Sequence, residues 1–97
     1  MFARLTIVQV KTAKITEFVK SYERLVIPVA KHQEGYIGDL MLTDYKTGKN
    51  ISITFWESER AATATEISGY YKQQVGRFTD YFTNPPVREG YEVSIQR

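Results

Sequence analysis

The sequence contains no cysteine and a single histidine, His32, and each shortage excludes a kind of site. Without cysteine the chain forms no disulfide, no thiolate nucleophile and no zinc–thiolate centre. One imidazole per chain excludes a metal site built from several histidines of that chain. The 11 aspartates and glutamates are scattered rather than clustered, so we expect no bound metal.

Long apolar runs and concentrated positive charge are also lacking. No stretch approaches the roughly 18 apolar residues that a membrane span needs, and no signal-peptide pattern follows Met1. The 13 basic residues are spread as thinly as the acidic ones and leave a net charge of +2, without the basic stripe of a nucleic-acid-binding protein. We therefore expect a cytoplasmic protein that binds neither membranes nor nucleic acid.

What the sequence does contain suffices for one small globular domain. Of its 97 residues, 42% are hydrophobic and 13% aromatic, and a chain of this size buries about two-thirds of its unfolded surface. No linker, internal repeat or low-complexity tract divides it. We predict a single domain over residues 1–97.

Strand-like and helix-like patterns follow one another along the chain. Alternating apolar residues predict strands, and apolar residues three and four apart predict helices. The predicted strands are 2–10, 36–43, 50–56 and 91–96, and the predicted helices are 13–33 and, in two pieces, 58–82. Within the first helix, Pro28 predicts a bend or a break, and Gly35 can end that helix in a left-handed conformation.

The order of these elements is β, α, β, β, α, β, with the middle strands joined as a hairpin through the turn 44–50. Right-handed crossovers fold this order into a four-stranded antiparallel sheet with both helices on one face. The sequence therefore predicts the α+β class and the ferredoxin-like arrangement.

Such a sheet has a second face that the chain's own helices leave uncovered. By the parity of the strands we expect that face to carry a mixture of apolar and polar side chains, namely Phe2, Thr6, Val8, Met41 and Thr54 with Arg4, Asp39, Glu92, Ser94 and Gln96. The mixture is too apolar to remain in water and too polar for a dry core. Two copies meeting about a twofold axis would bury the apolar members and pair the charged ones, so we expect a homodimer.

Trp56 lies where the third predicted strand passes into a helix that Ser58 can cap. A large aromatic residue at a strand exit is either a structural plug or a side chain that faces a ligand. Alternation puts Trp56 opposite Phe55, so Trp56 faces the partner sheet if Phe55 meets the helices, and a β-bulge would reverse this. The sequence leaves both orientations open.

The pattern resembles the antibiotic biosynthesis monooxygenase family, whose members are dimeric α/β barrels. The matching segments are FARLTIVQVKTAK, VIPVAKHQEGY, ITFWESERAATA, SGYYKQQVGRF and YEVSIQ, which together cover nearly the whole chain. The family includes cofactor-free oxygenases, haem-degrading enzymes and signal-molecule isomerases. The haem-degrading branch has an asparagine on the first strand, a tryptophan at the end of the third and a histidine on the next helix. Only Trp56 matches, so the resemblance implies no haem ligand.

His32 is the only side chain with an ordinary pKa near neutrality. Its spacing from Leu25 and Val29 puts it at the core-facing edge of the first helix, where it either stabilises the helix terminus or takes a proton from a phenolic or enolic substrate at a pocket mouth. The aromatic residues that such a pocket would use as walls are Trp56, Tyr22, Tyr70, Tyr71 and Phe78, each of which also fits an ordinary core.

Three functions stay open at this point. The first is a cofactor-free monooxygenase in which a deprotonated, electron-rich aromatic or enolic substrate itself reduces oxygen. The second is a non-catalytic dimeric module that binds a small molecule or regulates a partner. The third is an isomerase-like activity on a phosphorylated signal molecule, for which Lys31, Arg60 and Arg77 are the candidate basic residues.

Overall fold

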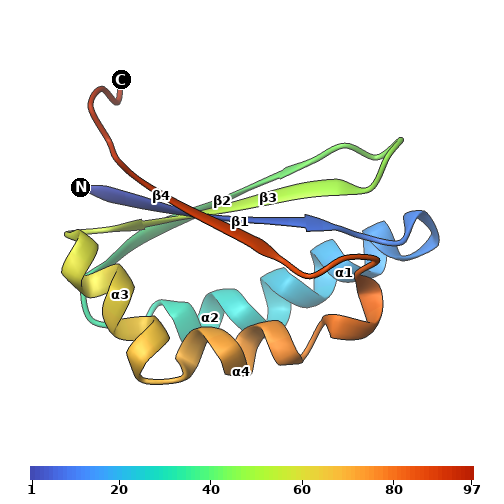
Figure 1. The fold of residues 1–97 in the computed structure, drawn as a ribbon, viewed down its shortest axis with the longest axis horizontal. Coiled ribbons are helices and arrows are strands. Elements are labelled where there is room, and N and C mark those ends of the chain that lie inside the picture. The colour runs from blue at the N-terminus through green and yellow to red at the C-terminus, as the bar shows by residue number, and fades with distance from the viewer.

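The computed structural model describes all 97 residues, and its four strands form one antiparallel sheet. The strands are β1 (Phe2–Gln9), β2 (Tyr36–Thr43), β3 (Lys49–Trp56) and β4 (Val87–Glu92). Their order across the sheet is β2-β3-β1-β4. Every helix lies on one side of the sheet, and the other side is uncovered (Figure 1). The predicted ferredoxin-like α+β fold is confirmed.

The first helical segment is interrupted, as Pro28 predicted. It consists of a short 3-10 turn (Thr12–Lys14), α1 (Ile15–Ser21), a π-helical turn (Tyr22–Val26) and α2 (Ile27–Ala30). Because Pro28 has no amide proton, it cannot donate to the carbonyl four residues earlier, and the wider π turn occupies that stretch. The segment ends at Ala30, three residues earlier than predicted. Gly35 has the expected positive φ, 81°.

The second helical segment is in two pieces, as predicted. α3 (Glu59–Ile67) begins at Ser58, whose side-chain oxygen accepts a hydrogen bond of 3.1 Å from the Ala61 amide. Gly69, with a φ of 83°, then redirects the chain into α4 (Tyr70–Gly76). A 3-10 turn, Thr79–Tyr81, leads towards β4.

The predicted position of the last strand, 91–96, was wrong by four residues. β4 starts directly after Pro86 and pairs with β1 from Val87 opposite Ile7 to Glu92 opposite Phe2. β1 begins at Phe2, so it has no residue in the strand that could pair with β4 beyond Glu92. The Val93 amide donates to the Met1 carbonyl at 2.9 Å, and the rest of the tail leaves the sheet (Figure 1).

The predicted assignment of the two sheet faces was also wrong. The side chains expected on the uncovered face, including Phe2, Arg4, Val8 and Asp39, point towards the helices. The uncovered face instead carries the alternate residues of each strand, namely Leu5, Ile7, Leu40, Leu42, Ile51, Ile53, Phe55, Val87 and Tyr91. Alternation defines two faces but does not say which one the helices cover.

Apolar side chains beneath the helices gather at the two ends of the sheet. One cluster joins Val8 and Val10 of β1 to Ile15, Phe18, Val26 and Phe78. The other is smaller and consists of Phe2, Trp56 and Ala62. Between the clusters the interior is hollow, as the next section describes. None of the helices combines the length and the apolar character that crossing a bilayer requires.

Candidate functional site

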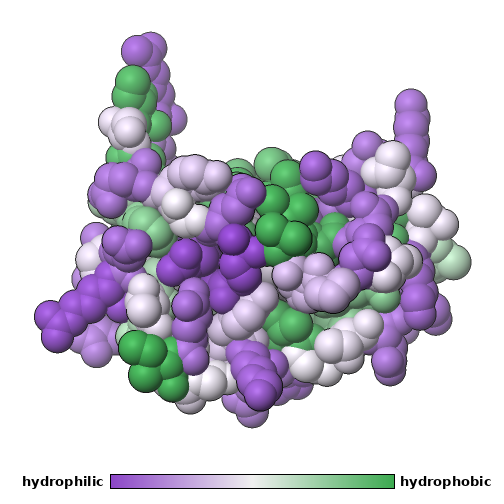
Figure 2. All heavy atoms as spheres, in the orientation of Figure 1, coloured by the Kyte–Doolittle hydropathy of each residue, from purple (hydrophilic) through white to green (hydrophobic).

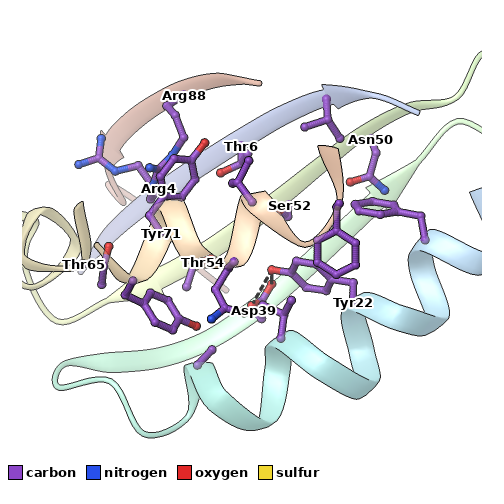
Figure 3. Close-up of a pocket in the computed structure, with 18 of the residues that line it drawn as sticks. Arg4, Thr6, Tyr22, Asp39, Asn50, Ser52, Thr54, Thr65, Tyr71 and Arg88 are labelled. Atoms are coloured by element: carbon purple, nitrogen blue, oxygen red, sulfur yellow. Dashed lines mark hydrogen bonds between the residues drawn. The ribbon is translucent and has the colours of Figure 1, made fainter. Parts of the chain in front are cut away.

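A cavity of about 90 Å³ lies between the helices and the sheet. Polar side chains from all four strands form its floor: Arg4, Thr6, Asp39, Asn50, Ser52, Thr54 and Arg88. Apolar and aromatic side chains from the helices form its roof, and Figure 3 shows the two sets facing one another. A volume of this order holds a few water molecules or one small ring.

The five aromatic residues predicted as pocket walls all line this cavity: Trp56, Tyr22, Tyr70, Tyr71 and Phe78. Trp56 is only 4% exposed and meets the ring of Tyr36 edge-on, with the centroids 6.0 Å apart. Against β1, β3 pairs without a shift up to Trp56 opposite Phe2. A register shift is present in the neighbouring β2, between Tyr36 and Gly38, but it does not change the alternation along β3. Trp56 therefore faces the helices and Phe55 faces away from them. Whether the five residues bind a ligand stays a prediction.

His32 does not line the cavity. It is exposed in the turn after α2, and its backbone amide donates to the Val29 carbonyl at 3.1 Å. The core-facing position expected for His32 assumed an unbroken α-helix. The π turn has more residues per turn than an α-helix, so it changes which of the following side chains face the core. Leu25 and Val29 are therefore 36% and 38% exposed, while Val26 and Ala30 are buried. The placement of His32 at a pocket mouth was wrong.

A carboxylate in the cavity floor, Asp39, is placed for the role of proton acceptor that was predicted for His32. Asp39 of β2 accepts hydrogen bonds from the hydroxyl of Tyr22, at 3.3 Å to Oδ1 and 3.2 Å to Oδ2 (Figure 3). Burial raises the pKa of Asp39 to about 6, although the hydrogen bonds from Tyr22 and from the Leu40 amide oppose the shift. Asp39 is therefore ionised at neutral pH, and its pKa is close enough to neutrality for it to take up a proton readily. A group poised in this way can act as a general base.

Tyrosine hydroxyls surround this carboxylate and stay protonated. Burial and the charge of Asp39 raise the pKa of Tyr22 far above its usual range and that of Tyr70 to about 12. The same two causes raise the pKa of Tyr36. At physiological pH these hydroxyls therefore remain hydrogen-bond donors. Two of the three residues, Tyr22 and Tyr70, line the cavity. Such donors can stabilise an oxyanion on a bound molecule.

Two arginines stand on the opposite side of the cavity floor. Arg4 of β1 and Arg88 of β4 both contact Glu66 of α3, with N–O distances of 3.3 and 3.5 Å. The guanidinium carbon of Arg88 lies 3.4 Å from the ring centroid of Tyr71, which is a cation–π geometry. Burial lowers the pKa of Arg88, though not enough to discharge a guanidinium at physiological pH.

Two buried amide oxygens in the cavity wall have no donor. Asn50 and Gln74 are 1% and 7% exposed, and neither Oδ1 of Asn50 nor Oε1 of Gln74 accepts a hydrogen bond. Buried acceptors are normally satisfied, so these two oxygens are available to a hydrogen-bond donor on a molecule bound in the cavity. No three histidine, aspartate or glutamate side chains converge in a way that could hold a metal ion.

Sequence reasoning missed Asp39, Arg4 and Arg88 as site residues because it placed two of them on the other face. A signal was nevertheless present. Strands 2–10, 36–43 and 50–56 each alternate an aliphatic set with a more polar set that includes Arg4, Asp39, Ser52 and Thr54. If the polar sets are taken together, they predict a polar floor on one face of the sheet.

Solved structures of other proteins share this fold over nearly the whole chain. A candidate antibiotic biosynthesis monooxygenase from Nitrosomonas europaea superimposes with a TM-score of 0.78 at 17% identity, over 98% of this chain and 100% of that one. Another from Bordetella bronchiseptica gives 0.81 at 11% identity, over 97% of both chains. The predicted resemblance to antibiotic biosynthesis monooxygenases is thus confirmed for the fold. No protein-family model matches the sequence, and no curated protein matches it either.

A third solved structure of this fold binds porphyrin. It is a MhuD variant with two manganese protoporphyrin IX groups bound per active site, with a TM-score of 0.73 and 16% identity, over 100% of this chain and 98% of that one. The residues of the present cavity do not fit such a group. No histidine reaches the cavity, and a space of about 90 Å³ does not accommodate a tetrapyrrole.

Proposed function

We propose that this chain is a cytoplasmic monooxygenase that uses no bound cofactor and oxidises a small aromatic or enolic compound in the cavity between its helices and sheet. The Asp39–Tyr22 pair is the observation that carries the proposal, because it puts a carboxylate with a pKa of about 6 beside a space walled by aromatic rings. The names of the structural neighbours support the reaction class.

The role assigned to Asp39 is that of proton acceptor. Above about pH 6 its carboxylate is ionised, so it can take the proton of a phenolic or enolic hydroxyl placed within hydrogen-bond distance. The hydroxyls of Tyr22 and Tyr70 then donate to the substrate oxyanion, and the apolar roof keeps out bulk water. His32 has no part in this scheme, because it lies outside the cavity.

Molecular oxygen is the oxidant, and the deprotonated substrate is the reductant. In a single-ring phenol, an oxygen atom of O₂ bonds to a ring carbon next to the one that bears the oxyanion. The O–O bond then breaks, and the second oxygen atom leaves as water with the hydroxyl proton held by Asp39 and the hydrogen of that ring carbon. The ring gains one oxygen, loses two hydrogens and becomes a quinone.

Oxygen uptake with a panel of single-ring phenols and hydroquinones under air tests the proposal. Asp39→Asn keeps an acceptor for Tyr22 but cannot take a proton, so we expect the rate to fall by about 10²–10⁴-fold. Asp80→Asn is the matched control, because Asp80 is exposed and outside the cavity, and it should leave the rate unchanged. Uptake that is equal in Asp39→Asn and in the wild type would contradict the role of Asp39.

The pH profile provides a second test of the same pair. The rate should rise with pH through about 6 as Asp39 ionises. The hydrogen bond from Tyr22 lowers the pKa of Asp39, so Tyr22→Phe should move this rise to higher pH. A rise at the same pH in both proteins would show that another group carries the proton.

We also propose that the chain forms a homodimer through the uncovered face of the sheet. That face is largely aliphatic, and Leu40, Leu42 and Val87 on it are 48%, 48% and 55% exposed. In Figure 2 apolar side chains gather along the upper side of the molecule at the level of the strands. Contiguous apolar surface of this kind marks an interface, and a self-complementary sheet face suits a twofold axis.

Oxygen consumption distinguishes the non-catalytic alternative from the proposed monooxygenase. A binding module would take up the same aromatic compounds, as seen in the fluorescence of Trp56, without consuming oxygen. The isomerase-like alternative loses its predicted basic residues, because Lys31, Arg60 and Arg77 do not line the cavity. Arg4 and Arg88 do line it.

A further inference from the structure

The two arginines of the cavity floor carry more positive charge than their surroundings neutralise. Glu66 is the only acidic side chain within ion-pair distance of either guanidinium, and it is shared between them. Its own side chain is 40% exposed, whereas those of Arg4 and Arg88 are only 16% and 21% exposed. One positive charge is thus left over in a largely buried place, where an uncompensated charge is costly.

Donor groups of both arginines are also unused. The Nε atoms of Arg4 and Arg88 are buried and have no hydrogen-bond partner. Both arginines line the cavity, and Glu66 does not. In Figure 3 Arg4 and Arg88 gather beside Tyr71, across the floor from the Tyr22–Asp39 hydrogen bonds. Planar guanidinium groups with free donors are suited to binding carboxylates and phosphates.

The sheet sets the distance between this cluster and Asp39. Asp39 pairs with Thr54, and Thr54 pairs with Arg4, so the three residues form one row across β2, β3 and β1. Neighbouring strands lie about 4.8 Å apart, which puts the Asp39 and Arg4 backbones about 10 Å apart. One aromatic ring with a hydroxyl at one end and an anionic group at the other spans such a gap.

We propose that Arg4 and Arg88 form an anion subsite, so that the compound bound in this cavity is a single-ring phenol or enol carrying a carboxylate or phosphate opposite its reactive hydroxyl. The inference rests on the proposed function, since it takes the same cavity and the same Asp39 end. It adds the charge and the orientation of the ligand. Glu66 is a positioning residue, which holds both guanidinium groups against α3.

Trp56 reports binding directly, because it is the only tryptophan and lines the cavity. The probes are 4-hydroxybenzoate, its uncharged isostere 4-hydroxybenzamide, and 4-hydroxyphenyl phosphate, each titrated against Trp56 fluorescence. We expect at least one anion to bind about 10-fold or more tightly than the amide, as a charge-assisted pair implies. If the phosphate binds more tightly than the carboxylate, the subsite is assigned to a phosphate monoester.

Arg4→Met and Arg88→Met should each weaken binding of the anion by about 10-fold or more and leave binding of the amide unchanged. Unchanged amide binding shows that the cavity is intact. Arg77→Met removes the same charge from an exposed position outside the cavity and should change neither affinity. Glu66→Gln should tighten anion binding, because it removes the charge that competes with the ligand.

Equal binding of anions and amide by the wild-type protein would overturn the subsite and leave the proposed function standing. Equal weakening of anions and amide by the arginine variants would show that the two residues only support the cavity, which also overturns it. If no compound of the panel bound, both the subsite and the proposed function would fail.

Discussion

The two faces of the sheet differ in polarity in the opposite sense from those of most two-layer proteins. The face beneath the helices carries Asn50 and Ser52 at 1% and 8% exposure, whereas the face without helices carries Leu40 and Leu42 at 48% each. A covered face normally supplies the apolar core, and an uncovered one is usually polar. The difference teaches that the covered face lines a cavity, whereas the uncovered face leaves aliphatic side chains in contact with solvent, which is the basis of the proposed homodimer.

The division also explains where the monomer finds its core. Apolar packing beneath the helices is confined to the ends of the sheet, around Phe18 and Phe78 at one end and around Trp56 at the other. The space between them is left for polar groups and a cavity. In the proposed homodimer, the uncovered face would bury apolar surface that a single chain leaves in water.

A charge on the uncovered face should have the largest effect. Leu40→Asp would put two uncompensated carboxylates into a twofold interface, so we expect the dimer to dissociate about 100-fold or more readily. Sedimentation velocity at micromolar concentration measures this. Ile67→Asp is the matched control, because Ile67 is 83% exposed on α3, on the helical side of the sheet. Identical sedimentation of Leu40→Asp and the wild type would remove the interface.

Adding a methyl group to the covered face should have a smaller effect than the charge on the uncovered face. The effect is a loss of folding stability. A Cβ on Gly90 would lie 2.5 Å from Nη1 of Arg4 and 2.7 Å from Cζ of Phe2, whereas one on Gly38 of the same sheet would meet nothing within 4 Å. We expect Gly90→Ala to lower the free energy of unfolding by about 1–3 kcal/mol and to weaken anion binding by displacing Arg4. Gly38→Ala should do neither. Urea denaturation compares the two, and equal stabilities would contradict the close packing.

The buried carboxylate predicts a third, pH-dependent effect. The pKa of Asp39 is raised from 3.8 to about 6 on folding, so the folded chain holds the proton more tightly. Its contribution to stability is complete below about pH 4 and is lost as the pH rises through 6. Asp39→Asn should therefore stabilise the protein at pH 8 by about 1–2 kcal/mol, allowing for solvent screening, while it slows oxygen uptake. Denaturation of both proteins at pH 4 and pH 8 measures the difference, and a variant that is less stable at pH 8 would contradict it.

The smallest effect is expected at an unsatisfied acceptor. Gln74 is buried with its Oε1 unpaired, so Gln74→Met should raise the free energy of unfolding by about 1 kcal/mol in the absence of ligand. Gln73→Met makes the same change at the exposed neighbouring position on α4 and should be neutral. Calorimetry compares the two variants. Destabilisation by Gln74→Met would mean that an ordered water molecule satisfies the amide.

Much of the fold could be predicted from the sequence because its signals are local. The alternation of apolar and polar residues predicted β2 and β3, Ser58 predicted the start of α3, and Pro28 predicted the interruption of the first helix. The last strand was displaced because the pattern from Tyr91 to Gln96 continues beyond the end of β1. The length of a strand depends on its partner as well as on its own residues.

The site was predicted less completely, and particular residues show why. Trp56, Tyr22 and Phe78 were identified because large aromatic residues near the core line any hollow that forms there. His32 was misplaced, since the π turn at Tyr22–Val26 rotated the helix after it. Asp39 and Arg4 were assigned to the wrong face, and their chemistry was therefore missed.

By itself the sequence determined the order of the strands and helices, the serine cap that begins α3 and the two alternating sets of side chains along the strands. These features depend on residues a few positions apart, whose spacing is fixed by backbone geometry. Only the tertiary structure decided which set the helices cover. That choice depends on how the helices pack across the whole sheet, and it brought Asp39, Tyr22, Arg4 and Arg88 around one cavity.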